Sequence, residues 1–537
     1  MYHVAVDQPQ DRGQKIMVNQ HAAISPRNQS QVAPAAPIAW SLLLPIAALP
    51  LVAHLLTAGN YGIFRDEYYY LACARHLAWG YVDHPPLSMA VLALIRAVAG
   101  EGILALRLFP ALCASALVLL TGCLAARLGG NRFAQVLAAV AMSLPGVMHV
   151  VTGFYSMNAL DLVIWAAAWL LLARWVTDSS PRLMIWLGIL LGLGLMNKLG
   201  ILILGAALAL ALLLTPLRRT LRTPAPYLGG AVAALIFLPH LIWQMTHGWP
   251  TLEFIANARQ YKISAMSPPD FLAEVVLEQN PITLLIWTVG LGWLLFAGRA
   301  RQFRLLGLMF VIGLGLLILQ HAKPYYTAGL FPVLFAAGAC AWEGFCARGR
   351  RRWLRPAIIV LLVAGGLFIL PLGVPVLPVE TFARWQIWSG IAPAAQEVGH
   401  TSELPQHYSD RFGWEELAAE VARVIKTLPP AEQARVVVIT RNYGEAGALE
   451  YWRERYGLPR VVSGHNNYWF WAPRELSLET VVAIGFSEDE VREGFSQVER
   501  AGELTQAWAL ESGVPIWIAR GSKLSWPQLL EKLRHFI

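Results

Sequence analysis

Long apolar segments recur between residues 38 and 377 of this chain and restrict what it can fold into. The hydrocarbon core of a bilayer is about 30 Å thick, and an α-helix of about 20 apolar residues crosses it. The composition agrees, because the chain is 56% hydrophobic and 14% charged, whereas soluble domains average about 25% charged residues. The sequence therefore predicts an α-helical multispan membrane protein. About eleven spans are expected, at residues 38–58, 103–125, 133–152, 157–175, 183–198, 199–216, 226–245, 281–298, 305–321, 325–346 and 357–377.

The basic residues predict the orientation of these spans, since cytoplasmic loops retain Lys and Arg. With the N-terminus inside, eighteen basic residues fall in inner segments and eight in outer segments up to residue 378. This asymmetry accounts for the net charge of +8 without a nucleic-acid partner. Residues 1–36 lack a signal-peptide pattern and are expected to form a disordered inner tail, so that the first span stays in the protein.

The composition changes after residue 378 to that of a soluble domain. Short β-branched runs at 436–440, 460–463, 480–486 and 514–520 alternate with helix-like segments at 414–428 and 487–501. Strands that alternate with helices indicate an α/β domain, and an odd number of spans places it outside. The predicted organisation is a tail at 1–36, a membrane domain at 37–378 and an α/β domain at 379–537. The five cysteines show no CxxC pair and no zinc spacing, so neither a disulfide framework nor a structural zinc is expected.

The first outer segment, GNYGIFRDEYYYLACARHLAWGYVDHPPL at 59–87, carries an unusual group of charges. It contains Arg65, Asp66, Glu67, Asp83 and His84 directly after the first span. The pattern YYYLACARHLAW suits an amphipathic helix in the membrane interface. A plain alternative is a solvated charge cluster in which Arg65 pairs with a carboxylate.

Further polar groups recur at the outer ends of later spans. Any one of them has an ordinary explanation, because a lysine at a span end can snorkel and an aromatic side chain can belong to the interfacial belt. Together they all face one side of the membrane, which favours a site for a substrate with an anionic head and an apolar tail, such as a lipid-linked phosphate. These groups are Asn158, Asp161, Asn197, Lys198, His247, Trp249, Glu253, His321, Lys323, Tyr325 and Tyr326.

Four segments carry a resemblance to a known family: FRDEYYYLACARHLAWGYVDHPPL, GLGLMNKLG, AKPYYTAGLFP and RNYGEAGALEYWRERYGLPRVVSGHNNYWFWAP (441–473). They resemble the polyprenyl-phosphate-dependent glycosyltransferases of the GT-C fold, in the bacterial glycosyltransferase family 39. That family is similar to protein O-mannosyltransferases, lipid A aminoarabinose transferases and lipopolysaccharide-core galacturonosyltransferases. The resemblance covers nearly all of residues 38–537 and implies a GT-C membrane domain.

The resemblance implies a general base at Asp66, with Glu67 beside it as a second catalytic candidate. Asp66 would take a proton from an acceptor hydroxyl, which attacks the anomeric carbon opposite the lipid phosphate and inverts it. Cations are then needed at the leaving phosphate, and Lys198 and Lys323 could supply them. The expected substrate-binding residues are Arg65, Tyr69, Asp83, His84, Asn158, Asp161, Lys198, Lys323, Tyr325 and Tyr326.

Two positions depart from the aminoarabinose transferases. Those enzymes have Arg where this chain has Tyr69, and Glu-Lys where it has Asp83-His84. Phosphate binding must then be arranged differently, and the sugar need not be aminoarabinose. Asp83 can hold the loop, orient the donor or bind a metal. No metal ligand is assigned, the need for a divalent metal is left open, and no other cofactor is expected.

The sequence thus predicts a multi-pass protein of the bacterial inner membrane, with a cytoplasmic N-terminus and a periplasmic α/β domain. The expected reaction is hexosyl or pentosyl transfer from a polyprenyl-phosphate sugar to a glycolipid or glycan, with a protein hydroxyl as the less favoured acceptor. Nucleotide sugars are not expected, because the soluble domain lacks GxGxxG spacing. A transporter or flippase of lipid-linked sugars is the alternative, although no internal repeat is visible. A structural assembly factor is a third reading.

Overall fold

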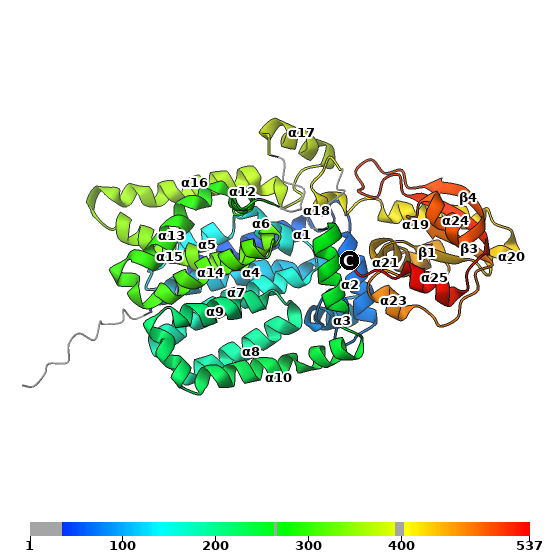
Figure 1. Cartoon of the computed structure of the whole chain (residues 1–537). Helices are drawn as coiled ribbons and strands as arrows, with labels where there is room; N and C mark the ends of the chain where they lie inside the picture. The colour runs from blue at the N-terminus through cyan, green and yellow to red at the C-terminus, as the bar shows by residue number, and fades with distance from the viewer. Residues whose placement is uncertain (1–34, 263–265, 392–401) are drawn as a thin grey trace, which may run out of the picture. The chain divides into compact units, whose positions relative to one another are not determined.

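Apolar α-helices dominate the N-terminal part of the molecule and lie side by side (Figure 1). The computed structural model describes residues 35–262, 266–391 and 402–537, so the predicted tail lies almost entirely outside the described residues. Every predicted span coincides with helix. The helices are α1 (Trp40–Leu56), α4 (Ile103–Arg127), α5 (Arg132–Met142), α6 (Gly146–Thr152), α7 (Met157–Asp178), α8 (Pro181–Asn197), α9 (Ile201–Leu213), α10 (Ala225–Thr246), α12 (Pro268–Glu278), α13 (Leu284–Phe296), α14 (Arg304–Leu319), α15 (Phe331–Cys346) and α16 (Leu354–Ile369).

Bent helix pairs leave a range for the number of membrane crossings. Among the described residues, six helices are long and apolar enough to cross a bilayer, or up to nine if each bent pair is one span. Pro145 lies in the break between α5 and α6, which bends by 64°, and Pro281 lies in the 97° break between α12 and α13. Proline lacks a backbone N–H and interrupts the helical hydrogen bonds at these breaks. The predicted total of eleven spans is therefore not confirmed.

Glycines bring two pairs of these helices into backbone contact. A methyl group on Gly188 of α8 would lie 2.1 Å from the carbonyl oxygen of Gly229 of α10. A methyl group on Gly338 of α15 would lie 2.0 Å from the carbonyl oxygen of Ile286 of α13. Helices in membranes commonly associate through such small residues. The contact with α10 fixes α8, whose C-terminal end carries Lys198.

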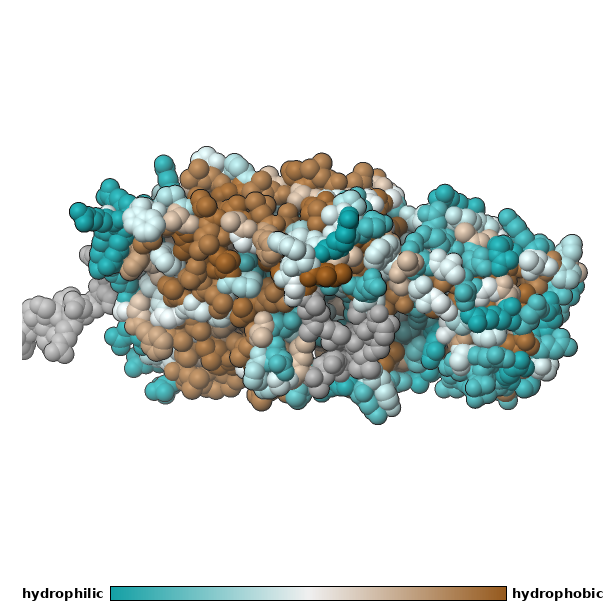
Figure 2. Space-filling model, turned by 90° about the horizontal axis from the view of Figure 1, so that it is seen from above, coloured by the Kyte–Doolittle hydropathy of each residue, from teal (hydrophilic) through white to brown (hydrophobic). Residues whose placement is uncertain are grey.

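The helical part exposes apolar side chains that would be costly in water. Leu56 at 79%, Val98 at 81% and Phe296 at 81% exposure are examples from three different segments. Figure 2 shows hydrophobic residues gathered over the helical part and hydrophilic residues over the α/β part. A hydrocarbon environment removes the cost of exposing such surface. The chain is a membrane protein.

The C-terminal part contains a five-stranded mixed sheet in the order β2-β1-β3-β5-β4. Strands β2, β1 and β3 are parallel, whereas β5 pairs antiparallel with both β3 and β4. The predicted α/β class of this part is confirmed. The strands are β1 (Val437–Thr440), β2 (Val461–Ser463), β3 (Thr480–Ile484), β4 (Phe495–Glu503) and β5 (Pro515–Ser522), and the helices are α19 (Trp414–Lys426), α20 (Pro430–Gln433), α21 (Tyr443–Tyr451), α22 (Arg453–Tyr456), α23 (Asn467–Trp471), α24 (Glu488–Gly494) and α25 (Trp526–Leu533).

One sequence-based element is wrong in its second half. Residues 487–501 were expected to form a helix, but α24 ends at Gly494 and β4 begins at Phe495. Dense charge is typical of a solvated helix, yet it also suits an edge strand whose residues face water. Antiparallel pairing from Phe495 with Ser522 to Glu503 with Pro515 decides between the two.

Helix α2 (Arg65–Arg75) joins the membrane and α/β parts. All residues from Glu67 to Ala74 are buried, so the expectation of a helix lying in the membrane interface with one wet face is wrong. Its tyrosines share a hydrophobic cluster with Trp414, Leu417 and Val438 of the α/β part. Residues 35–537 form one compact unit, and the expected domain boundary near residue 378 stays a prediction.

The remaining helices and turns lie between the elements already named. They are α3 (Leu87–Ala99), α11 (Pro250–Asn257), α17 (Val379–Ser389) and α18 (Gln406–Ser409), with shorter turns η1 (Pro216–Arg222), η2 (Ala258–Lys262), η3 (Pro281–Thr283), η4 (Gly298–Phe303), η5 (Pro324–Leu330), η6 (Gly349–Trp353) and η7 (Leu370–Leu372).

Candidate active site

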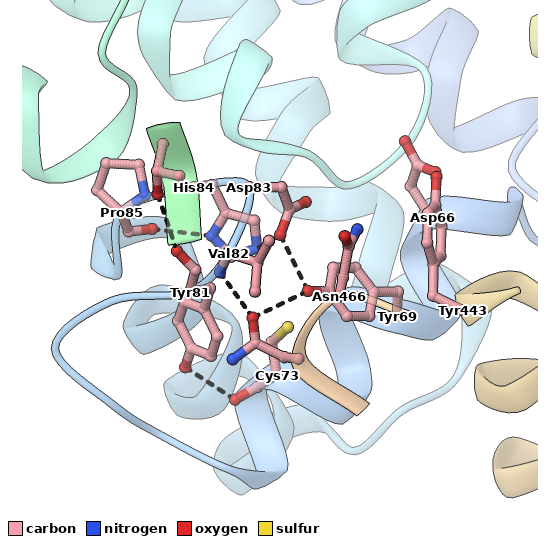
Figure 3. A network of polar contacts seen from close by, with 12 residues as sticks. Asp66, Tyr69, Cys73, Tyr81, Val82, Asp83, His84, Pro85, Tyr443 and Asn466 are labelled. Carbon is pink, nitrogen blue, oxygen red and sulfur yellow. Dashed lines mark hydrogen bonds and ion pairs between the residues drawn. The ribbon is translucent and has the colours of Figure 1, made fainter. Parts of the chain in front are cut away.

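Asp66 lies in the first turn of α2, with its side chain 29% exposed. The Tyr443 hydroxyl donates a hydrogen bond of 2.8 Å to Asp66 Oδ1 (Figure 3). Arg65 Nε lies 3.7 Å from the same oxygen, while Arg65 Nη2 lies 3.4 Å from Asp410 Oδ2. A negative charge is also favoured at a helix N-terminus. Asp66 is therefore an oriented carboxylate that remains accessible.

Glu67, the adjacent carboxylate, has the opposite environment. It is 0% exposed, and its Oε1 accepts from Arg107 Nη1 at 2.8 Å and from the Tyr155 N–H at 2.7 Å. Its Oε2 accepts from the Phe64 N–H at 2.9 Å, which closes the capping box of α2. Both carboxylate oxygens are thus engaged, and the Arg107 charge balances that of Glu67. These contacts favour a structural role, and the catalytic role expected for Glu67 stays untested.

Tyr69, Asp83 and His84 form a second group beside Asp66 (Figure 3). The Tyr69 hydroxyl donates to Asp83 Oδ1 at 2.9 Å, and His84 Nε2 lies 3.9 Å from the same oxygen. Burial and then the Asp83 charge raise the pKa of Tyr69 well above its usual value, so its phenol stays protonated. His84 is 1% exposed, and its Nδ1 lies 2.9 Å from the carbonyl oxygen of Pro85. The three residues are therefore in contact, while the substrate-binding role expected for them stays a prediction.

Lys198 is the centre of a third group. Its ammonium donates to Asn158 Oδ1 at 2.7 Å and lies 4.3 Å from the ring centroid of Tyr326 and 5.5 Å from that of Tyr325. Asp161, one turn after Asn158 on α7, is buried and interacts electrostatically with Lys198. The structure therefore assembles five predicted residues from three separate segments into one cationic, aromatic cluster.

Three other positions noted in the sequence are placed differently. Lys323 precedes the turn η5 that carries both tyrosines and is half-buried. Glu253 accepts from Arg534 Nη2 at 2.6 Å, and the His247 ring lies 5.4 Å from that of Phe470. Of the outer groups noted in the sequence, His247 and Glu253 thus contact the α/β part.

A chain of hydrogen bonds runs between residues that neighbour these groups. Ser88 Oγ donates to Asn197 Oδ1, and Asn197, directly before Lys198, donates through Nδ2 to the Met157 carbonyl at 2.9 Å. The Tyr155 hydroxyl donates to the Ser88 carbonyl at 2.6 Å, while the Tyr155 N–H donates to Glu67. The start of α3, which carries Ser88, is thereby tied to both α2 and α8.

Sequence reasoning did not assign the residues that support the site. Arg107 had a usable signal, because a charge inside a long apolar helix is costly unless it has a partner. Tyr443 and Asn467 had none, since only folding brings them to α2 from the distant α/β part.

No metal centre emerges from the described ranges. They contain no group of three or more His, Cys, Asp or Glu side chains that could hold an ion. The assignment of no metal ligand stays a prediction.

Comparisons with known proteins bear on the fold of the chain and on the family that part of it matches. The family described as dolichyl-phosphate-mannose-protein mannosyltransferase matches residues 83–243, which include Asp83, Lys198 and the residues between them but not Asp66. A comparison with curated protein sequences gives no match.

Solved structures give a broader likeness. The crystal structure of ArnT from Cupriavidus metallidurans in the apo state has a TM-score of 0.59 and 14% identity, over 90% of this chain and 98% of that one. The structure of the same protein bound to undecaprenyl phosphate has a TM-score of 0.57 and 15% identity, over 89% and 98%. The chain has the GT-C fold of these structures, and its residues 83–243 are similar to the protein mannosyltransferase family, which confirms the predicted fold class and supports the resemblance.

Proposed function

We propose that this protein is an inverting glycosyltransferase that moves one sugar from a polyprenyl-phosphate donor to an outward-facing acceptor. The observation that carries the proposal is the contrast between two adjacent carboxylates. Glu67 is buried and balanced by Arg107, whereas Asp66 is 29% exposed at the start of α2. A carboxylate that is oriented but accessible suits a general base.

In the proposed reaction Asp66 removes the proton from an acceptor hydroxyl. The freed oxygen forms a bond to the anomeric carbon on the face opposite the phosphate. The bond between that carbon and the phosphate oxygen breaks, and the electron pair leaves with the polyprenyl phosphate. A positioned general base contributes about 10²–10⁴-fold to such a step.

The group around Lys198 is the proposed site of the donor phosphate. Its ammonium can balance the charge that develops on the leaving group, and the hydroxyls of Tyr325 and Tyr326 can donate hydrogen bonds to it. Asn158 and Asp161 would orient the ammonium, and Lys323 would add a second cation. The likeness to an ArnT structure that contains undecaprenyl phosphate supports a lipid-linked donor.

The remaining parts of the proposal concern placement and specificity. The basic inner loops support a bacterial inner-membrane protein with its α/β domain in the periplasm. Arg65, Tyr69, Asp83 and His84 would shape the donor side of the first outer loop. We propose a hexose or pentose as the transferred sugar and a glycolipid or glycan as the acceptor.

Transfer by the purified protein tests this proposal. The full chain in detergent is incubated with polyprenyl-phosphate sugars and with glycolipids extracted from the cell envelope, and the products are read by mass spectrometry. We expect the acceptor to gain one sugar mass as free polyprenyl phosphate appears. Envelope extracts from cells with and without the gene should differ by the same mass. The protein is also reconstituted into lipid vesicles. Movement of intact donor across the vesicle membrane without release of polyprenyl phosphate would instead identify a flippase.

A further inference from the structure

Helix α21 of the α/β part packs tightly against α2. A methyl group on Gly444 would lie 2.4 Å from Cγ of Arg65, and one on Gly447 would lie 2.8 Å from the carbonyl carbon of Tyr68. Real Cβ atoms do not approach other atoms so closely, so the two glycines are what allows the helices to meet. The first residue of α21, Tyr443, is thereby held at a fixed distance from the first turn of α2.

The N-terminus of α21 is itself firmly capped. Asn442 Oδ1 accepts from the Glu445 N–H at 2.9 Å, and Glu445 Oε2 accepts from the Asn442 N–H at 3.0 Å. This reciprocal arrangement is a capping box. The Tyr443 N–H also donates to His465 Nδ1 at 3.3 Å. The backbone that carries Tyr443 is thus fixed on both sides.

The Tyr443 side chain reaches from the α/β part to Asp66. It is 8% exposed, and its ring centroid lies 4.9 Å from that of Tyr69 and 4.8 Å from that of His465. The two neighbouring rings leave the phenol little freedom, and its hydroxyl donates to Asp66 Oδ1 at 2.8 Å. Oδ1 therefore accepts the hydrogen bond from Tyr443, and Oδ2 is the oxygen that can face the hydroxyl of the sugar acceptor.

We infer that Tyr443 is a positioning residue for Asp66, and that the α/β domain therefore completes the active site. The inference rests on the proposed function, because it gives Asp66 the role of general base. Tyr443 holds the carboxylate in one rotamer, in which Oδ1 faces both the Tyr443 hydroxyl and Arg65 Nε. Because the α/β domain contacts the proposed base directly, catalysis requires this domain to be packed against α2.

A second contact from the same domain supports this inference. Asn467, at the start of α23, accepts from the Val82 N–H at 2.7 Å through Oδ1. The same oxygen lies 3.3 Å from the Tyr69 hydroxyl, which donates to Asp83. The α/β domain thus contacts the surroundings of both partly buried carboxylates of the first outer loop, Asp66 and Asp83.

Charged and titratable groups face Asp66 from several elements. Arg65 lies beside it on α2, Tyr443 faces it from α21, and Asp410 binds Arg65 from the segment before α19. Burial and then the charge of Asp66 raise the pKa of Tyr70. Loss of the Tyr443 hydroxyl removes a hydrogen bond to Asp66 without removing a charge.

The test compares the full-length wild type with Tyr443→Phe and a matched control, Tyr468→Phe. The control removes the same hydroxyl from a buried tyrosine of the same domain, where it donates to Glu450 Oε2 at 3.0 Å. Two measurements are made in detergent at one pH. The first gives kcat and donor KM for sugar transfer. The second is the extent of labelling of Asp66 by a water-soluble carbodiimide and glycine ethyl ester, read by peptide mass spectrometry.

For Tyr443→Phe we expect kcat to fall about tenfold at little change in donor KM, the scale of one hydrogen bond to a charged group. Labelling of Asp66 should increase, because the α/β domain no longer holds the carboxylate. Tyr468→Phe should leave kcat and labelling unchanged. Unchanged kcat and labelling in Tyr443→Phe would overturn the inference. Increased labelling in Tyr443→Phe with an inactive wild type would overturn the proposed function and still support the contact between the α/β domain and Asp66.

Discussion

Replacement of Glu67 by Gln should destabilise the protein strongly, even though Glu67 is adjacent to the proposed base. Glu67 accepts three hydrogen bonds from buried donors, on Arg107, Tyr155 and Phe64. A glutamine side chain has a single acceptor oxygen, and its NH₂ group must face at least one of these donors. The substitution also leaves the Arg107 guanidinium, 2% exposed, without its charge partner.

The size of the effect follows from this burial. Breaking a buried ion pair by removing one partner costs about 3–5 kcal/mol, a large part of a typical stability of about 5–15 kcal/mol. Glu101 provides the matched control, because it pairs with Arg75 and Arg96 at 26% exposure. An exposed pair is worth about 0–1 kcal/mol, so Glu101→Gln should change little.

Stability is measured as the fraction of purified protein that stays monodisperse in gel filtration after heating in detergent. We expect Glu67→Gln to lose this fraction at a much lower temperature than the wild type and Glu101→Gln. The double variant Glu67→Gln with Arg107→Met should be more stable than the sum of the single effects, because no buried charge is left unpaired. A Glu67→Gln protein of normal stability that loses transfer as completely as an Asp66 variant would refute this reasoning. In that case the two carboxylates share the catalytic role.

Three further predictions concern other parts of the molecule. Lys198→Met and Lys323→Met should raise the donor KM while folding is kept. Lys426→Met, an exposed control, should leave the donor KM unchanged. A normal donor KM in the Lys198 and Lys323 variants would return both lysines to a snorkelling role. Burial and then the Glu511 charge raise the pKa of Glu445, so its contribution to stability is full below the unfolded value near pH 4.3 and is lost as pH rises. Glu445→Gln should therefore flatten the fall of melting temperature as pH rises above that unfolded value, and an unchanged slope would contradict this. Gly447→Ala should separate α21 from α2 and lower both stability and transfer, and wild-type values would show that this contact is not close.

Local sequence signals predicted most of the helices and strands and the polar groups of the site. The apolar runs predicted the positions of the helices, because the length of an apolar run is a local property of each segment. The sequence placed Tyr69, Asp83, Lys198 and the two tyrosines on one side of the membrane, but it did not predict which of them contact one another. Breaks such as the one at Pro281 changed the possible span count, because a helix of sufficient apolar length can still be interrupted.

What the sequence missed depends on contacts between distant segments. Residues 495–501 form a strand because β5 offers an unpaired edge, which no local pattern reveals. Glu67 and Asp66 look equivalent in the sequence, yet Arg107 from α4 buries and balances only Glu67. Tyr443 reaches Asp66 because two glycines let α21 approach α2.

The central claim is that Asp66 is the general base, and the Asp66→Asn variant tests it most directly. Asparagine keeps the size and an acceptor for the Tyr443 hydroxyl but cannot take a proton. The measurement is the rate of sugar transfer from a polyprenyl-phosphate donor by the purified variant, with folding checked by gel filtration. We expect the transfer rate to fall at least about 10²-fold at unchanged thermal stability. A fully active, well-folded Asp66→Asn protein would contradict it and leave the carboxylate as part of a solvated surface.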